Sequence, residues 1–506
     1  MKRYGRTTIL ANYTEEQLLN AKPNELDKII IDILEQSASI HQANKDDCID
    51  LKSYYYGDQD VYFKEKHTRE EINNQIVENW AYAFVDFKKT YLLGEPIQYV
   101  QQGNVNTSEV SLLNRLLSYE GKKTKDIELY EDILVCGRGF RYTNKDANTN
   151  LEEDEAPFEI INCPVEDTEV VYSSTLGNKQ LLSYIVTDME YIPQSANDEG
   201  EEIKPIPYKE IKVYLRNKVL TYSNQLGNFK RIGEEQPLMY GEHIITEYYV
   251  NRKRISLIEL GKDLFDAINN LESLDADDFE QFVNAIMVFT NAKISEEELE
   301  EVKELGALCI NSTDGQKASV ELLEQRLNAN DTQLYYNRLL DALHTILGIP
   351  KASDNGYMTS GDTGKAKLTG QGYTSATIRI KNDINMFGMC DMKCINLIIK
   401  ICRNIAKSGI KELKVSNIQP NFQTDTSDNL LVKTQGLMNL YACDIPREYA
   451  NSLVNLFPDA HQVTEEQQRL FGDQVSQQGA TNDTEKEIQE QDNTITRVSQ
   501  SDSQDQ

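Results

Sequence analysis

Residues 350–372 read PKASDNGYMTSGDTGKAKLTGQG, a glycine-rich stretch between two segments with helical periodicity. Before it, residues 331–347 carry apolar side chains at three- and four-residue steps, which predicts an amphipathic helix that Gly348 and Pro350 end. After it, residues 373–406 predict a second helix of about 50 Å at 1.5 Å per residue. A solvated surface loop is the commoner case, but loops this long in compact proteins are usually functional or disordered, and the flanking helices favour a functional loop.

The stretch contains Gly-Asp-Thr-Gly-Lys-Ala, which invites comparison with a phosphate-binding P-loop. That motif needs a glycine where Thr359 stands and a serine or threonine where Ala366 follows Lys365. It also needs a strand before the loop, where a helix is predicted here. The spacing argues against nucleotide binding, although a phosphate-handling enzyme that uses the glycine-rich loop stays an alternative function.

The composition is that of a large protein with several domains. The chain has 506 residues, of which 39% are hydrophobic, and we expect neither a membrane span nor a signal peptide. Cys390, Cys394 and Cys402 share a helical face, but no histidine lies near them in sequence, so buried thiols are favoured over a metal site. We expect no catalytic residues, no metal, no cofactor and no membrane partner.

The formal net charge of −30 is the strongest compositional feature. A surface this negative repels nucleic acid at long range, so it excludes ordinary DNA binding by bulk attraction. It suits a protein past which DNA must slide without sticking.

The patterns along the chain predict an α+β protein. Residues 24–36 predict an amphipathic helix within an N-terminal arm. A β-rich section follows from residue 139 to 250, with short apolar or alternating runs at 158–164, 169–172, 181–186, 210–215, 219–222 and 243–250. Gly57 and Gly94 are expected in the left-handed conformation that ends helices. Residues 255–292 predict a long helix, and an insert with its own strands follows it.

Three passages of the chain carry a family resemblance. They are Tyr54-Tyr-Tyr-Gly-Asp-Gln59 with Asn79 and Lys89-Thr-Tyr-Leu-Leu-Gly-Glu-Pro-Ile97 behind it, Gly137-Arg-Gly-Phe-Arg-Tyr142, and the Ser360-Gly361 element that runs through Ala366 to Leu368. Together they resemble the portal proteins of tailed bacteriophages, in the form found in siphoviruses of Gram-positive bacteria. With the order of elements, the resemblance covers residues 44–470, although the third passage is longer than the family's usual spacing.

The resemblance implies the phage portal fold, with wing, stem, clip and crown, in a ring of about twelve copies around a DNA channel. The implied parts are an N-terminal arm (1–40), the wing (41–250), a stem helix (251–292), the clip (293–328), a second stem helix (329–349), the tunnel loop (350–372), a long helix back into the wing (373–410), a wing strand with crown helices (411–472) and a disordered tail (473–506).

Two groups of functional residues follow from the resemblance. The tunnel loop would present polar and basic side chains to the DNA channel: Asn355, Thr359, Ser360, Thr363, Lys365 and Lys367. The first stem helix would present an acidic face: Asp263, Asp266, Glu272, Asp275, Asp277 and Asp278. The acids would repel DNA while the lysines make transient phosphate contacts. The acids fit an ordinary solvated helix face equally well.

The implied function is the channel through which the phage genome is packaged and ejected, at one vertex of the capsid in the virion and in the host cytoplasm during assembly. The implied partners are other copies of the chain, double-stranded DNA, the terminase large subunit, a head–tail adaptor, and the major capsid and scaffolding proteins. ATP hydrolysis would belong to the terminase, so we expect no enzyme here. A non-channel scaffold or adaptor that binds partners through its long helix is a third interpretation.

Overall fold

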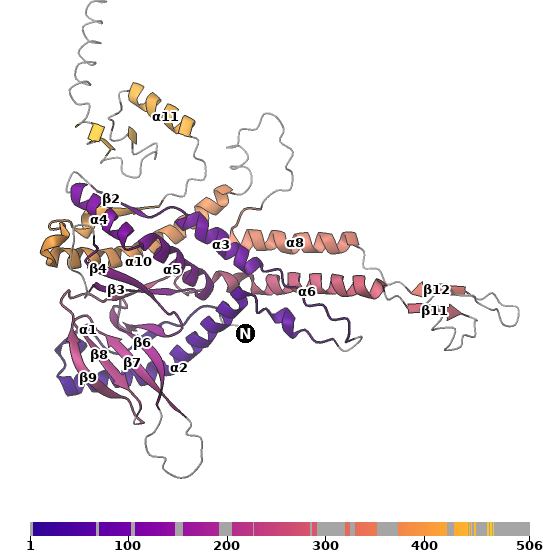
Figure 1. Cartoon of the computed structure of the whole chain (residues 1–506), viewed down its shortest axis with the longest axis horizontal. Coiled ribbons are helices and arrows are strands. Elements are labelled where there is room, and N and C mark those ends of the chain that lie inside the picture. The colour runs from indigo at the N-terminus through magenta and orange to yellow at the C-terminus, as the bar shows by residue number, and fades with distance from the viewer. Residues whose placement is uncertain are drawn as a thin grey trace, which may run out of the picture. The chain divides into compact units, whose positions relative to one another are not determined.

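The computed structural model describes residues 4–66, 70–102, 107–146, 155–191, 205–225, 227–283, 286–290, 319–323, 329–351, 373–422 and 430–443, with scattered positions between 445 and 469. Residues 352–372, which hold the predicted tunnel loop, lie outside the described residues, as do most of the predicted clip and the C-terminal tail. The described residues form helices and sheets in a mixed arrangement (Figure 1). The α+β class predicted from the sequence is therefore confirmed.

The chain divides into two compact units, each assembled from segments that are distant in sequence. The first unit comprises Met1–Gly94, Lys125–Tyr142 and Ile161–Asp391, and the second comprises Glu95–Thr124, Thr143–Ile160 and Met392–Gln506. The predicted division of the chain into successive domains stays a prediction.

The first unit contains a six-stranded sheet in the order β1-β5-β6-β7-β8-β9. Its strands are β1 (Ile9–Ala11), β5 (Thr168–Ser173), β6 (Gln180–Tyr191), β7 (Ile206–Tyr214), β8 (Lys218–Ser223) and β9 (Lys230–Pro237). All neighbours are antiparallel except β1, which runs parallel to β5. The N-terminal residues expected as a separate arm thus contribute an edge strand to this sheet.

Helix α2 (Pro23–Tyr56) covers the sheet with its apolar stripe (Figure 1). The predicted helix at 24–36 ended too early because the buried stripe turns polar and contains Ser37, His41 and Asn44. Apolar periodicity therefore stops while the helix continues. It ends at Gly57, whose φ of 114° is the predicted left-handed conformation.

A buried ion pair lies beside the polar stripe of α2 and bonds to Asn44. Both terminal nitrogens of Arg138 donate to Glu169, at 2.7 and 2.8 Å, and Asn44 donates to the same carboxylate at 3.0 Å. Burial raises the pKa of Glu169, but Arg138 and the other donors outweigh it and hold the pKa below its ordinary value. The Gly-Arg-Gly passage at 137–139 thus places the positively charged Arg138 in the core, where Glu169 neutralises it.

The remaining elements complete the two units. They are α1 (Glu15–Asn20), α3 (Trp80–Leu93), α4 (Thr107–Tyr119), α5 (Lys122–Cys136), α6 (Leu257–Val283), α8 (Ala329–Leu347), α10 (Tyr373–Asn404) and α11 (Leu430–Ala442), with the small sheets β10 (Ile245–Tyr248)-β3 (Gly139–Lys145)-β4 (Phe158–Cys163), β11 (Ile286–Thr290)-β12 (Ser319–Leu323) and β13 (Ile418–Asn421)-β2 (Gln98–Gln101). No helix among the described residues is long and apolar enough to span a membrane.

Two local predictions were wrong. The helix expected to reach residue 292 ends at Val283, because residues 286–290 pair with β12 as a strand. Gly94 is right-handed, with φ −56°, since its amide still bonds to the Thr90 carbonyl and continues the helix. The three cysteines on α10 are buried free thiols, as predicted: Cys390, Cys394 and Cys402.

Gly137 cannot accept a side chain without strain, which gives a test of the fold. Its φ is +83°, and an added Cβ would lie 1.9 Å from the Arg254 carbonyl oxygen. Gly177 has a similar φ of +98° but open space around it. Gly177→Ala should cost about 1–2 kcal/mol from the left-handed backbone alone. Gly137→Ala should lower the thermal unfolding midpoint much further, and equal midpoints would contradict the close packing.

Candidate functional site

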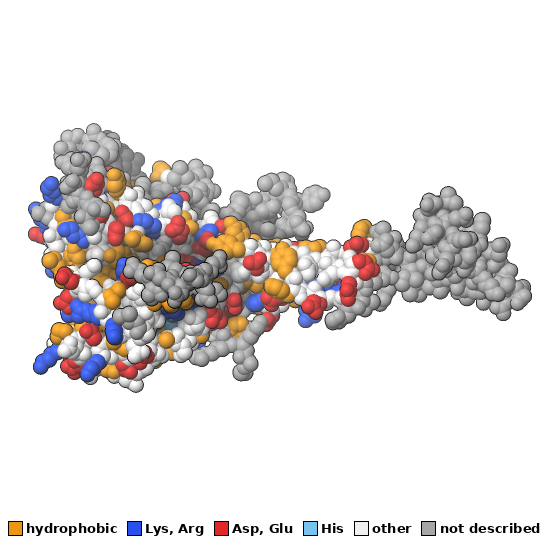
Figure 2. Space-filling model, turned by 60° about the horizontal axis from the view of Figure 1, so that its bottom comes forward, with side chains coloured by type: hydrophobic (Ala, Val, Ile, Leu, Met, Phe, Trp, Pro, Cys, Tyr) orange, Lys and Arg blue, Asp and Glu red, His pale blue; other side chains and the backbone are white. Residues whose placement is uncertain are grey.

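Helices α6 and α8 pack side by side and lead into the β11–β12 hairpin (Figure 1). A Cβ on Gly261 of α6 would lie 2.6 Å from the ring of Phe265 and 3.3 Å from Leu343 of α8, so this glycine leaves room for both side chains. Figure 2 shows acidic and apolar side chains together on this helix pair. It is the region where the sequence predicted the stem.

An extended segment, residues 72–78, runs along α6, and we call it the strap. Side chains of α6 accept hydrogen bonds from alternate backbone amides of the strap: Asn74 N to Asp277 at 2.6 Å, Ile76 N to Ser273 at 3.0 Å and Glu78 N to Asn269 at 2.9 Å. Four residues of helix rise about 6.0 Å. Two residues of extended chain rise about 6.6 Å. The spacing of every second strap amide therefore matches the spacing of every fourth α6 side chain, which allows three such bonds in a row.

Asp277 anchors the far end of the strap. Its carboxylate is buried and accepts from Lys64 at 3.0 Å, from Lys66 at 3.1 Å and from two nitrogens of Asn74. Burial raises the pKa of this carboxyl, but the Asn74 amide and the two lysines outweigh that effect and lower the pKa to about 2. Asp277 is therefore charged and fully engaged at neutral pH.

The near end of the strap connects to α2 and α3 through amide side chains. Gln59 donates to Asn79 Oδ1 at 3.1 Å, and Asn79 donates to the Tyr55 carbonyl at 2.9 Å while it caps α3. Asn269 of α6 donates to Gln59. The first passage of the family resemblance contains Gln59 and Asn79, but nothing in the sequence indicated that they connect to α6.

The six predicted acids of α6 do not share one face. Asp277 is buried, and Asp266 accepts from Tyr54 at 2.7 Å and from Lys262 at 3.2 Å. The other four lie at exposed or half-buried positions: Asp263, Glu272, Asp275 and Asp278. Burial, followed by the charges of Glu78 and Asp275, raises the pKa of Glu272. The structure thus separates Asp277 and Asp266, which bond to other segments of the first unit, from the four acids at more exposed positions.

Both ends of the predicted tunnel loop are fixed. Arg379, near the start of α10, donates to the Ile346 carbonyl at the end of α8 at 2.9 Å. Thr377 contacts the Tyr91 hydroxyl at 2.7 Å. The predicted loop residues themselves lie outside the described residues: Asn355, Thr359, Ser360, Thr363, Lys365 and Lys367. Their assignment stays a prediction.

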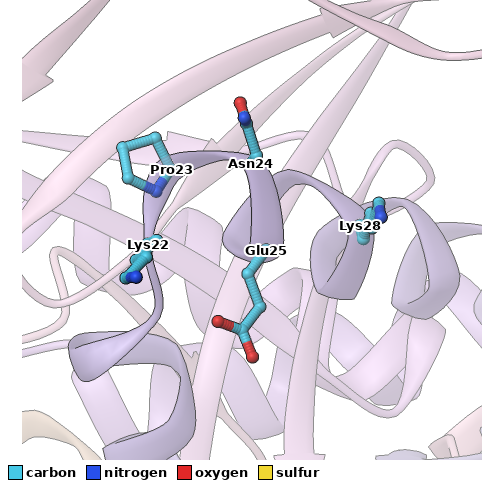
Figure 3. Close-up of a pocket in the computed structure, with 5 residues that line it drawn as sticks. All are labelled: Lys22, Pro23, Asn24, Glu25 and Lys28. Atoms are coloured by element: carbon cyan, nitrogen blue, oxygen red, sulfur yellow. The ribbon is translucent and has the colours of Figure 1, made fainter.

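Figure 3 shows a shallow hollow at the start of α2, lined by Lys22, Pro23, Asn24, Glu25 and Lys28. All five residues come from one helix end, and their side chains point in different directions. Among the described residues, no group of three or more His, Cys, Asp or Glu is placed to hold a metal ion. We assign no binding site to the hollow.

A family model described as "Phage portal protein, SPP1 Gp6-like" matches residues 34–480. The chain belongs to this family. Membership confirms the family predicted from the three passages. The "Portal protein" of Bacillus phage SPP1 is 22% identical over 301 residues, which cover 53% of this chain and 55% of the relative. The alignment therefore spans about half the length of that portal protein.

Removing the Asp277 carboxylate should release the strap. In Asp277→Ala, Lys64 and Lys66 lose their shared partner and the Asn74 amide is left unpaired. Limited trypsin digestion should then cleave after these lysines several-fold faster than in the wild type. Asp275→Ala, which removes an exposed acid from the same helix, is the matched control. Equal cleavage rates in both variants would show that the strap is held by other contacts.

Proposed function

We propose that this chain forms the ring-shaped DNA channel at one vertex of a phage capsid, through which the genome is packaged and ejected. The observation that carries the proposal is the match of the portal family model to residues 34–480. The pair α6 and α8, continued by the β11–β12 hairpin, supports it as a stem with the base of a clip. The six-stranded sheet with α2 fits the wing.

Exposed apolar side chains on the helix pair support assembly into a ring. Leu274 is 46% exposed and Phe279 is 73% exposed on α6, while Leu334 is 68% exposed and Tyr335 is 49% exposed on α8. Apolar side chains gathered on a single helix pair are typical of an interaction surface. In the proposed ring of about twelve copies, the neighbouring subunits would cover them.

The four solvent-facing acids of α6 are proposed to line the channel: Asp263, Glu272, Asp275 and Asp278. Asp277 and Asp266 are left out of this set because they bond to residues outside α6. Negative charge repeated around a ring would repel the DNA backbone and prevent strong adhesion. Lys365 and Lys367 of the tunnel loop would make the weak phosphate contacts, and repetition among subunits would sum them.

The proposed partners are the terminase large subunit, a head–tail adaptor, and the major capsid and scaffolding proteins. ATP hydrolysis is assigned to the terminase, and we propose that this chain has no enzymatic activity of its own. Its place would be the portal vertex of the virion, after assembly in the host cytoplasm.

Electron microscopy and native mass measurement of the purified protein test the ring directly. We expect annular particles of about twelve copies with a central opening. A monomer at micromolar concentration would contradict the proposal and favour a non-channel adaptor. Thermal stabilisation by added ATP or GTP would instead favour the phosphate-handling enzyme, because a ligand that binds only the folded state raises its stability.

The variant Lys365→Glu with Lys367→Glu tests the tunnel loop. Rings should form normally, while DNA packaging falls several-fold because each subunit loses its attraction for phosphate. Lys179→Glu with Lys230→Glu makes the same change in net charge at two exposed positions of the first unit and should package normally. Equal packaging by the two double variants would show that Lys365 and Lys367 do not contribute to packaging.

A further inference from the structure

The charge of the chain reverses near the end of α10. Acids outnumber bases by 82 to 52 in the whole sequence. Residues 392–411, however, contain no Asp or Glu and hold a run of basic side chains: Lys393, Lys400, Arg403, Lys407 and Lys411. Glu412 and Lys414 follow. All of these residues belong to the second unit and are described in the structure.

Most of these basic side chains face solvent. We define the basic patch as Lys393, Arg403, Lys407, Lys411 and Lys414, all of them exposed. Arg403 donates to the carbonyls of Glu412 and Leu413 and so ties the patch to its own loop. The four lysines form no ion pair with an acid among the described residues. Their charge is therefore available to a partner.

The segment after α10, which carries Lys407, Lys411 and Lys414 of the patch, is held by hydrogen bonds to α4. The carboxylate of Glu109, on α4, accepts from three consecutive backbone amides: Lys411 at 3.1 Å, Glu412 at 3.2 Å and Leu413 at 2.6 Å. Ile410 and Leu413 are fully buried between the exposed lysines. Figure 1 shows the end of α10 beside α4. The Glu109 carboxylate is thus bonded to the backbone, and among the described residues it forms no ion pair with these lysines.

The surroundings of the patch favour a nucleic acid over a protein partner. The exposed large apolar side chains of the chain include none between residues 392 and 422. Protein interfaces have an apolar, aromatic-rich centre, whereas DNA interfaces are polar and positively charged. Lys393 and Arg403 are about 15 Å apart along α10, a distance that covers several phosphates of a duplex.

We propose that the basic patch binds the phosphate backbone of double-stranded DNA, through residues other than those of the tunnel loop. The choice of DNA as the polyanion rests on the proposed portal function. Exposed lysines make phosphate contacts without reading base sequence. The patch therefore binds duplexes of any sequence, and its affinity falls steeply as salt rises.

The test uses the assembled full-length protein and a short, fluorescently labelled duplex of random sequence. In the triple variant Lys407→Glu, Lys411→Glu, Lys414→Glu, affinity measured by anisotropy should fall at least tenfold at low salt. The slope of log affinity against log salt should fall by about three for each subunit that contacts the duplex. Circular dichroism checks that the variant is folded.

The matched control is Lys28→Glu, Lys179→Glu, Lys230→Glu, which reverses three exposed lysines of the first unit. The control should keep the wild-type affinity and slope. An equal loss of affinity in both variants would show that the total charge of the protein governs binding, and it would contradict a DNA site at the basic patch. A wild-type protein that binds no duplex would contradict the proposal as well. A changed mass of the assembled particle in the patch variant would show that the patch contacts a neighbouring subunit, and this result would also contradict the proposal. Microscopy of the wild type separately decides whether a ring exists, so the two proposals fail independently.

Discussion

The hydrogen bonds from alternate backbone amides of the strap to side chains four residues apart on α6 are the interaction that fixes the position of α6. They satisfy three backbone donors with side chains of Asp277, Ser273 and Asn269, and they leave α6 no freedom to slide along the strap. The network continues through Gln59 and the cap of α3. These bonds hold α6 at one register against the strap, because a shift of one residue would break all three at once.

The net charge of −30 conceals an uneven distribution. Some acids are structural: Glu169 neutralises Arg138 in the core, and Asp277 holds two lysines. Others face solvent on α6. The described end of α10 is positive instead. The net charge of the whole chain thus describes neither the acidic surface proposed for the channel nor the basic surface proposed to bind DNA. The contacts of each side chain are needed to tell which charges are exposed.

The sequence predicted the regular elements well where burial follows hydrophobic periodicity. Helices α8 and α10 and most strands of the large sheet were recognised on that basis. The second half of α2 was missed because its buried face is built from polar side chains such as His41 and Asn44. Strand β9 was missed because it is almost wholly exposed. The role of Asp277 depends on residues about two hundred positions away, and no local pattern reveals such a contact.

The bond from Arg379 to the Ile346 carbonyl fixes the distance between the two ends of residues 352–372. A connection with fixed ends can change its length at little thermodynamic cost, since each doubling adds only about 0.6 kcal/mol of closure entropy. Insertions or deletions between these anchors would therefore leave α8 and α10 undisturbed. Evolution can vary the contents of this segment while the helices that carry it stay the same.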